Sequence, residues 1–137
     1  MSHLHPQQLA AQVIGAVVER SGIDPARIDD VIWGTNMQVG KQASNVGRMG
    51  ALLAGLPDTV GGVTMDRACG AGITSVSFAT ASIGSDNEDA IIAGGTEMMS
   101  YTNSLPLDGY HHANRDPALL EQHPLSHQGV AADAIAG

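Results

Sequence analysis

The residue with the clearest chemical potential is Cys69, the only cysteine among the 137 residues, in the segment RACGAGITSV. Its neighbours are small, and Gly70 and Gly72 carry no side chains that would block a substrate approaching the sulfur. The uncharged stretch that follows predicts a helix starting at Cys69. Unpaired backbone N–H groups and the helix dipole stabilise an anion at such an end. The segment therefore predicts a nucleophilic thiolate whose neighbouring N–H groups could hold an oxyanion.

A second interpretation of Cys69 is purely structural. Free cysteines are among the most buried residue types and act as small apolar side chains. A strand that leads into Cys-Gly-x-Gly and then into a helix is an unusual arrangement for such a residue. The residues by themselves leave both interpretations open.

The elements expected around Cys69 follow from hydrophobic spacing and from the positions of glycine and proline. Strand, helix and strand in this order predict a βαβ unit with parallel pairing, and the chain from 101 to 125 reads as irregular. The expected helices cover residues 6–20, 45–54 (capped by Ser44), 70–82 and part of 126–137, and the expected strands cover 31–35, 62–66 and 90–95. Gly34, inside the first strand, indicates a close backbone neighbour or a bulge.

The span from 68 to 85 contains no charged residue. A membrane-spanning helix is one explanation, but the span is too rich in serine, threonine and glycine for lipid. A helix without a charged face is typical of one buried between two layers of a soluble protein. We therefore expect a buried helix that starts at Cys69.

Composition and charge exclude several classes of function. The formal net charge is −8, from 14 acidic and 6 basic residues, which disfavours a nucleic-acid binder and an anionic membrane surface as partners. No secretory signal is visible, and one cysteine cannot form an internal disulfide, so a cytoplasmic location is expected. Aromatic residues make up 3% of the chain, which predicts a core of aliphatic and small side chains.

Several motifs together resemble the thiolase family, which comprises acetyl-CoA acetyltransferases and 3-ketoacyl-CoA thiolases. They occur in the family's order and spacing over nearly the whole chain. The matching residues are Asn45 and Arg48, Ala54–Pro57, Arg67 with Cys69–Gly72, and Gly94–Ser100. Two departures are Asp66 and Ala71, which stand where the family commonly has Asn and Ser, and neither removes the cysteine.

The resemblance implies an α/β, thiolase-like layered fold with a mixed sheet around the buried helix that starts at Cys69. Residues 1–100 would be a partial N-terminal domain. Residues 101–137 would begin the loop region that forms the substrate pocket. The resemblance also implies a homodimer.

The same resemblance implies that Cys69 accepts an acyl group from acyl-CoA in fatty acid metabolism, giving an acyl-enzyme. His127 and Gln128 match a family segment that lines the substrate pocket, although Gln128 replaces the usual Met. Coenzyme A thioesters would be substrates, with no resident cofactor and no metal. Glu97, in the matching GGTEMM, is expected to be a buried structural carboxylate, and Arg48 and Arg67 are expected to pair with carboxylates.

The family's catalytic histidine and second cysteine, in G-H-P and C-x-G-G-G segments, have no match here. The chain is therefore expected to be an incomplete thiolase without turnover of its own. A β-ketoacyl synthase-like condensing enzyme and a non-catalytic truncated relic are the alternatives. His111 with His112, and His123 with His127, raise the possibility of metal binding, but no carboxylate completes a ligand set.

Overall fold

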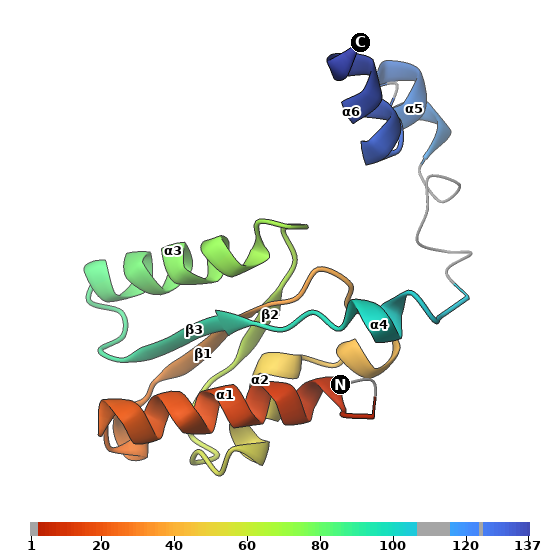
Figure 1. Ribbon diagram of the computed structural model, residues 1–137. Coiled ribbons are helices and arrows are strands. Elements are labelled where there is room, and N and C mark those ends of the chain that lie inside the picture. The colour runs from red at the N-terminus through yellow and green to blue at the C-terminus, as the bar shows by residue number, and fades with distance from the viewer. Residues whose placement is uncertain (1–2, 107–115, 124) are drawn as a thin grey trace. The chain divides into compact units, whose positions relative to one another are not determined.

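A three-stranded parallel sheet organises the first part of the chain (Figure 1). The computed structural model describes residues 3–106, 116–123 and 125–137. Strand β1 (Asp30–Gly34) is central, and β2 (Val63–Met65) and β3 (Ile91–Gly95) pair with it in parallel. The predicted parallel βαβ unit is confirmed. The expected mixed sheet is wrong for the described strands, because a helix between consecutive strands returns the chain to the same end of the sheet.

Helices cover both faces of the sheet. In Figure 1, α1 (Pro6–Ser21) and α2 (Val46–Leu53) lie on one side and α3 (Ala71–Gly84) on the other. The remaining elements are 3-10 turns at Pro25–Arg27 and Gly40–Gln42 and helices α4 (Met99–Thr102), α5 (Pro117–Gln122) and α6 (Gln128–Ala136). The predicted helices that became α1, α2 and α3 and all three strands lie within two residues of their expected bounds.

The hydrophobic core lies between the sheet and the helices α1 and α2. Its members are aliphatic or small apart from Trp33, as the composition predicted. The buried cluster comprises Ala10, Ile14, Ile28, Val31, Trp33, Val46, Ala51, Leu56, Val60 and Ile92. Trp33 is 1% exposed, and its indole N–H donates to the Thr96 hydroxyl at 3.0 Å. That bond ties the strand β1 to the chain that follows β3.

Helix ends follow recognisable capping rules. His5 caps α1 in a capping box with Gln8, and Gly22 ends the helix in the left-handed conformation at φ 66°. The N-cap of α2 is Asn45 rather than the expected Ser44, because the side-chain oxygen of Asn45 accepts the Arg48 N–H at 3.2 Å. Helix α5 falls in the region expected to be irregular. Asp116 caps it and Pro117 opens it.

Helix α3 is buried on one side only. It begins at Ala71, two residues after Cys69, and its buried residues Ala71, Thr74, Ser75 and Ala79 face the sheet. Ile73, on the other side, is 77% exposed. The expectation of a helix that starts at Cys69 and is buried between two layers is therefore corrected, because among the described residues a layer covers α3 from the sheet side alone.

The chain divides into two compact units, residues 1–102 and 103–137. The second unit contains α5 and α6, and none of the described residues of these two helices is buried. That residues 101–137 begin a substrate-pocket region stays a prediction. Within the described ranges no helix combines the length and the apolar character needed to cross a membrane.

Candidate functional site

Cys69 lies in a tight turn between the strand β2 and the helix α3. The Asp66 carboxylate accepts the Ala68 N–H at 2.7 Å, and the Arg67 carbonyl accepts the Gly70 N–H at 3.0 Å. The Ala68 carbonyl accepts the Ala71 N–H at 3.1 Å. Overlapping turns thus fix the backbone on both sides of the sulfur.

The backbone at Ala68 adopts a positive φ of 45°. This conformation is unfavourable for a residue with a Cβ atom and persists only where surrounding bonds enforce it. The hydrogen bonds at the Ala68 N–H and carbonyl provide that constraint. Nothing in the sequence pointed to this strain, since alanine is not a residue that marks left-handed turns.

Cys69 is exposed, just before the first turn of α3. Gly70 occupies the N-cap position, and no side chain caps the helix there. The Gly70 and Ala71 N–H groups are bonded within the turn, and no side chain caps the N–H groups that follow them, which leaves those groups to an anion. The exposure contradicts the interpretation of Cys69 as a buried structural residue. An electrophile and a developing negative charge can both reach this end of the helix.

The C-terminal end of β1 packs directly against the first turn of α3. A Cβ atom added to Gly34 would lie 2.7 Å from the Ala71 carbonyl carbon and 2.9 Å from the Gly72 nitrogen. Gly95 is similarly close, because its Cβ would lie 2.6 Å from the Gly34 carbonyl oxygen. The predicted close neighbour of Gly34 is confirmed. These glycines allow two strands and the helix to stack by direct backbone contact.

Glu97 joins the chain segments that leave β1 and β3. One carboxylate oxygen accepts the N–H groups of Asn36 at 2.8 Å and Met37 at 3.2 Å. The other accepts an N–H of the Gln42 side-chain amide at 2.9 Å. The side-chain oxygen of Gln42 in turn accepts the Met98 N–H at 2.6 Å. Glu97 is therefore the hydrogen-bonded structural carboxylate that was expected, although it is exposed rather than buried.

Gln42 is a structural link beside the site that the sequence did not reveal. Its side chain is fully buried and makes three hydrogen bonds, the third donated to the Met37 carbonyl at 2.9 Å. A glutamine in a polar loop carries no signal of this role. These bonds fix the loop after β1 at the end of the sheet that also contacts the cysteine turn.

Arg48 and Asn45 hold α2 against the chain that leads into β2. The Arg48 guanidinium donates to the backbone carbonyls of Val60 and of Asp58, the latter at 2.8 Å. The Asn45 amide donates to the Gly62 carbonyl at 2.8 Å. The expected pairing of Arg48 with a carboxylate is therefore wrong, since carbonyl groups take its donors.

Arg67 also differs from the expected carboxylate pairing. Its guanidinium carbon lies 5.7 Å from the centroid of the Phe78 ring, within the range of a cation–π contact. The contact places the Arg67 side chain against the helix α3.

His127 and Gln128 belong to the second unit. His127 caps α6, and its Nδ1 accepts the Gly129 N–H at 3.2 Å. Gln128 is the first residue of that helix, and both residues are exposed. Their assignment to a substrate pocket stays a prediction.

The described residues contain no group of three or more His, Cys, Asp or Glu side chains that could hold a metal ion. His123 and His127 are among the described residues. His111 and His112 lie outside them.

Comparison with known proteins places this geometry in a family. Residues 1–135 match the family model described as thiolase, N-terminal domain. A steroid 3-ketoacyl-CoA thiolase of Mycobacterium tuberculosis is 42% identical over 100 residues, which cover 73% of this chain and 25% of that protein. A 3-ketoacyl-CoA thiolase of Psychrobacter cryohalolentis is 37% identical over 103 residues, 75% of this chain and 26% of its own length.

A solved structure gives the same picture. The acetyl-CoA acetyltransferase of Bacillus anthracis aligns with a TM-score of 0.68 and 37% identity, covering 72% of this chain and 25% of that one. The chain thus spans about a quarter of the length of the relatives it matches.

Proposed function

The chain belongs to the thiolase family, and on that premise we propose that Cys69 is the nucleophile of acyl transfer between coenzyme A thioesters. The observation that carries the proposal is the exposed thiol beside the uncapped first turn of α3. The names of the relatives support the substrate class, since they are 3-ketoacyl-CoA thiolases and an acetyl-CoA acetyltransferase.

The proposed chemistry has two stages. The Cys69 thiolate attacks the thioester carbonyl carbon, and backbone N–H groups at the start of α3 stabilise the oxyanion that forms. Collapse of this intermediate expels the coenzyme A thiolate and leaves an acyl-cysteine. The acyl group then passes to the thiolate of coenzyme A, or to the carbanion of acetyl-CoA with formation of a carbon–carbon bond, and in either case a base outside these residues would take the proton that the acceptor loses. Cys69 leaves as a thiolate, so the enzyme returns to its starting state.

The proposal concerns a protein of which this chain is about a quarter by the length of its relatives. In that protein His127 and Gln128 would line the acyl-CoA pocket, and the partners would be acyl-CoA, coenzyme A and a second copy. No resident metal or redox cofactor is required by the chemistry, and a cytoplasmic location is proposed. The histidine and second cysteine that the family resemblance implies have no match in this sequence, so we expect no turnover from the 137 residues alone.

The test compares the reactivity of two exposed thiols in the same folded chain. Iodoacetamide labelling at neutral pH is measured for the wild-type protein and for a Cys69→Ala, Val13→Cys variant. Val13 is an exposed α1 residue away from any helix start, so its thiol reports ordinary reactivity. Cys69 is expected to react faster by about tenfold, because backbone N–H groups and the dipole at the start of a helix activate a nucleophilic cysteine.

Unfolding in urea should remove that advantage, and Cys69→Ala alone should show no labelling. Equal or slower labelling of Cys69 in the folded chain would contradict the proposal. A second measurement is mass spectrometry after incubation with acetyl-CoA, in which an acetyl adduct on Cys69 that is absent from the Val13→Cys variant supports the acyl-enzyme.

A further inference from the structure

The cysteine turn is carried by a short strand at the edge of the sheet. Strand β2 has three residues, and among the described strands it pairs with β1 alone. The ladder of such a short edge strand specifies its register weakly. A slip of one residue would turn each β2 side chain to the opposite face and move the following turn by about 3.3 Å. Any contact that fixes this register therefore also fixes the position of Cys69.

The side chain of Asn45 contacts this segment at two positions. Its amide nitrogen donates to the Gly62 carbonyl at 2.8 Å, and its oxygen accepts the Thr64 hydroxyl at 2.8 Å. Residues 62 and 64 are two apart, which is the repeat of an extended chain. A slip of one residue in either direction would bring Val63 or Met65 to the place of Thr64, and neither has a hydroxyl group. The bonds of Asn45 therefore select one register of β2.

Two glycines bring the first turn of α2 directly against this segment. The Gly47 N–H donates to the Thr64 hydroxyl oxygen at 2.9 Å, and a Cβ atom on Gly47 would lie only 3.3 Å from that oxygen. A Cβ atom on Gly62 would lie 2.7 Å from the Arg48 Cα atom. These contacts fix the distance between the helix and the strand, and the Asn45 bonds fix their position along the strand direction.

The backbone before α2 is left-handed at two residues in succession, with φ 62° at Ser44 and 57° at Asn45. Residues with a Cβ atom rarely adopt this conformation, and surrounding contacts must enforce it. Capping does not require it, although the Asn45 oxygen also accepts the Arg48 N–H at 3.2 Å. Other side-chain N-caps in the described ranges have φ between −57° and −86°, at His5, Asp24, Asp116 and His127. The left-handed turn is therefore what brings the Asn45 cap against β2.

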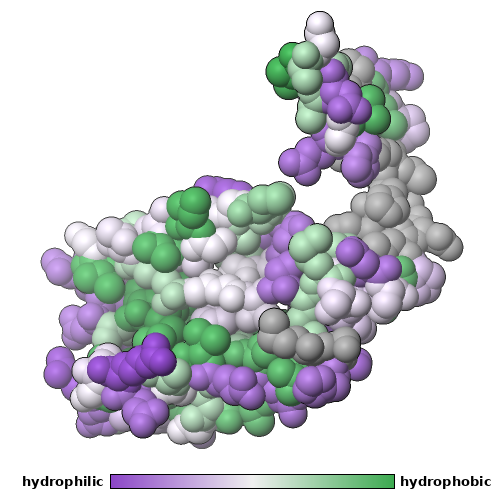
Figure 2. Space-filling view, viewed as in Figure 1, coloured by the Kyte–Doolittle hydropathy of each residue, from purple (hydrophilic) through white to green (hydrophobic). Residues whose placement is uncertain are grey.

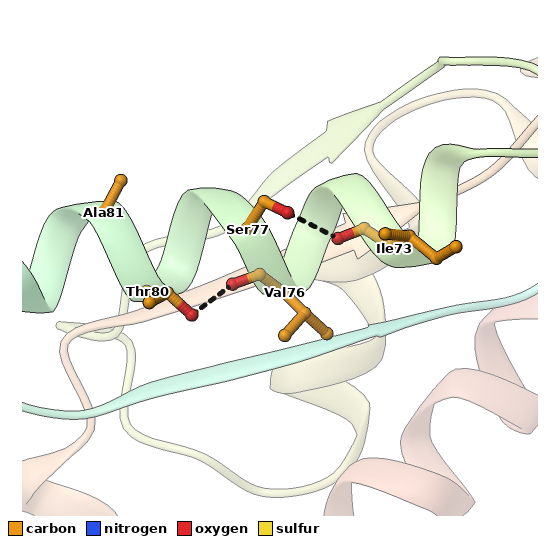
Figure 3. Close-up of a pocket in the computed structure, with 5 residues that line it drawn as sticks. All are labelled: Ile73, Val76, Ser77, Thr80 and Ala81. Carbon is orange, nitrogen blue, oxygen red and sulfur yellow. Dashed lines mark hydrogen bonds between the residues drawn. The ribbon is translucent and has the colours of Figure 1, made fainter.

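Helix α3, at the other end of the cysteine turn, is covered from the sheet side alone among the described residues. Apolar side chains gather over this helix in the space-filling view (Figure 2). Its outer face forms a shallow open depression (Figure 3), lined by Ile73, Val76, Ser77, Thr80 and Ala81. The Ser77 and Thr80 hydroxyls donate to carbonyls of the same helix at 3.1 and 2.8 Å. The placement of the turn therefore depends on the sheet, through β2 and the end of β1.

We infer that Asn45 is a positioning residue for Cys69, because it holds β2 in the register that places the cysteine turn. Asn45 acts through the strand and not at the reacting atoms. Its catalytic consequence rests on the proposed role of Cys69, since backbone N–H groups at the start of α3 can act on the sulfur only when it is held beside them. That Asn45 fixes the turn rests on the contacts of β2 alone.

Amide hydrogen exchange tests whether Asn45 fixes the turn. Asn45→Gly removes both bonds to β2, while glycine adopts φ 57° without strain. The Gly70 and Ala71 N–H groups, which are bonded within the turn, should exchange about tenfold faster or more relative to the amides of β3. Ile28→Val is the control, since it shortens a core side chain near the start of β3 and should leave this ratio unchanged. An equal acceleration in the turn and in β3 would overturn the proposal.

A pair of substitutions at Thr64 tests the consequence for the thiol. Thr64→Val keeps the shape of the side chain and loses the hydroxyl that joins Asn45 to Gly47, whereas Thr64→Ser keeps the hydroxyl. Iodoacetamide labelling of folded Cys69 should slow about threefold or more in Thr64→Val and stay close to wild type in Thr64→Ser. Labelling in urea should be the same for both. Equal labelling rates of the folded pair would overturn the positioning role, whatever their melting temperatures.

The two experiments separate this inference from the proposed chemistry. A wild-type Cys69 that labels no faster than the Val13→Cys thiol would contradict the nucleophile, and the exchange ratio would still decide whether Asn45 fixes the turn. A fast wild-type Cys69 whose rate is unchanged by Asn45→Gly and by Thr64→Val would support the nucleophile and overturn the role of Asn45.

Discussion

Gly34 at the end of β1 is in direct backbone contact with Ala71 at the start of α3. A Cβ atom on Gly34 would lie 2.7 Å from the Ala71 carbonyl carbon, which is too close for a non-bonded Cβ contact. Both contacting groups are backbone, so neither can rotate away. The position of the cysteine turn therefore requires glycine at residue 34, since no larger side chain fits there.

We predict that Gly34→Ala lowers the free energy of unfolding by about 1–3 kcal/mol, because the added methyl group forces the strand and the helix apart. Iodoacetamide labelling of Cys69 should also change, since the first turn of α3 must shift. Gly15→Ala is the control, because a Cβ there meets nothing within 4 Å. It should raise stability by about 0.5–1 kcal/mol through helix propensity. Urea denaturation measures both, and a neutral Gly34→Ala would refute the contact.

Ala68 stores backbone strain at φ 45°. Ala68→Gly should raise the free energy of unfolding by about 0.5–1 kcal/mol, because relief of the left-handed conformation exceeds the added entropy of the unfolded chain. Ala68→Val should lower it by about 1–2 kcal/mol, since a β-branched residue tolerates this φ poorly. Thermal unfolding of the pair gives the comparison, and the same sign for both variants would argue against strain.

Glu97 links the segments after β1 and β3 by accepting three hydrogen bonds, from the N–H groups of Asn36 and Met37 and from the Gln42 side-chain amide. Glu97→Ala should lower the free energy of unfolding by about 1–2 kcal/mol, since it leaves the buried Gln42 amide with an unsatisfied donor. Glu121→Ala removes an exposed carboxylate from α5 and should change stability little. Equal denaturation midpoints for the two variants would show that the Glu97 contacts do not stabilise the fold.

Asp29 makes the sheet sensitive to acid. Its carboxylate accepts the N–H groups of Ala90 at 2.9 Å and Asp89 at 2.8 Å, and these bonds lower the pKa of Asp29 below its ordinary value. A carboxylate with a lowered pKa in the folded state contributes stability above its unfolded pKa of about 3.9, and loses it as the pH falls through the folded value. Asp29→Asn should therefore melt below wild type at pH 7.

The difference in melting temperature between wild type and Asp29→Asn should shrink as the pH is lowered below about 4. Asp24→Asn supplies a comparison with another exposed aspartate that accepts one backbone N–H, from Ala26 at 3.0 Å. A gap between wild type and Asp29→Asn that stays constant from neutral to acidic pH would disprove this assignment.

The elements around the site were predictable because their signals are local. The apolar period of α1, its opening Pro6 and its final Gly22 are visible in the sequence and fix the helix to within a residue. The short apolar run of β1 and its Gly34 predicted both a strand and a close neighbour. Patterns of this kind depend on residues close together in the sequence, so they can be recognised without knowledge of the tertiary fold.

The features that were missed depend on distant partners. Gln42 is buried because segments more than fifty residues away in the sequence supply its bonding groups. Arg48 donates to carbonyl groups whose positions are set by the loop after α2. The uncharged sequence of α3 predicted burial on both sides, but among the described residues only the side that faces the sheet is covered.

The stacked glycines at positions 34 and 95 carry a consequence for biosynthesis. The groups that shape the turn around the thiol all come from the span between these two residues, so the turn can form once the third strand has been made. A ribosome still translating later codons would then already display a shaped, solvent-facing sulfur. Protecting that sulfur from oxidants during translation would become a task for the cell.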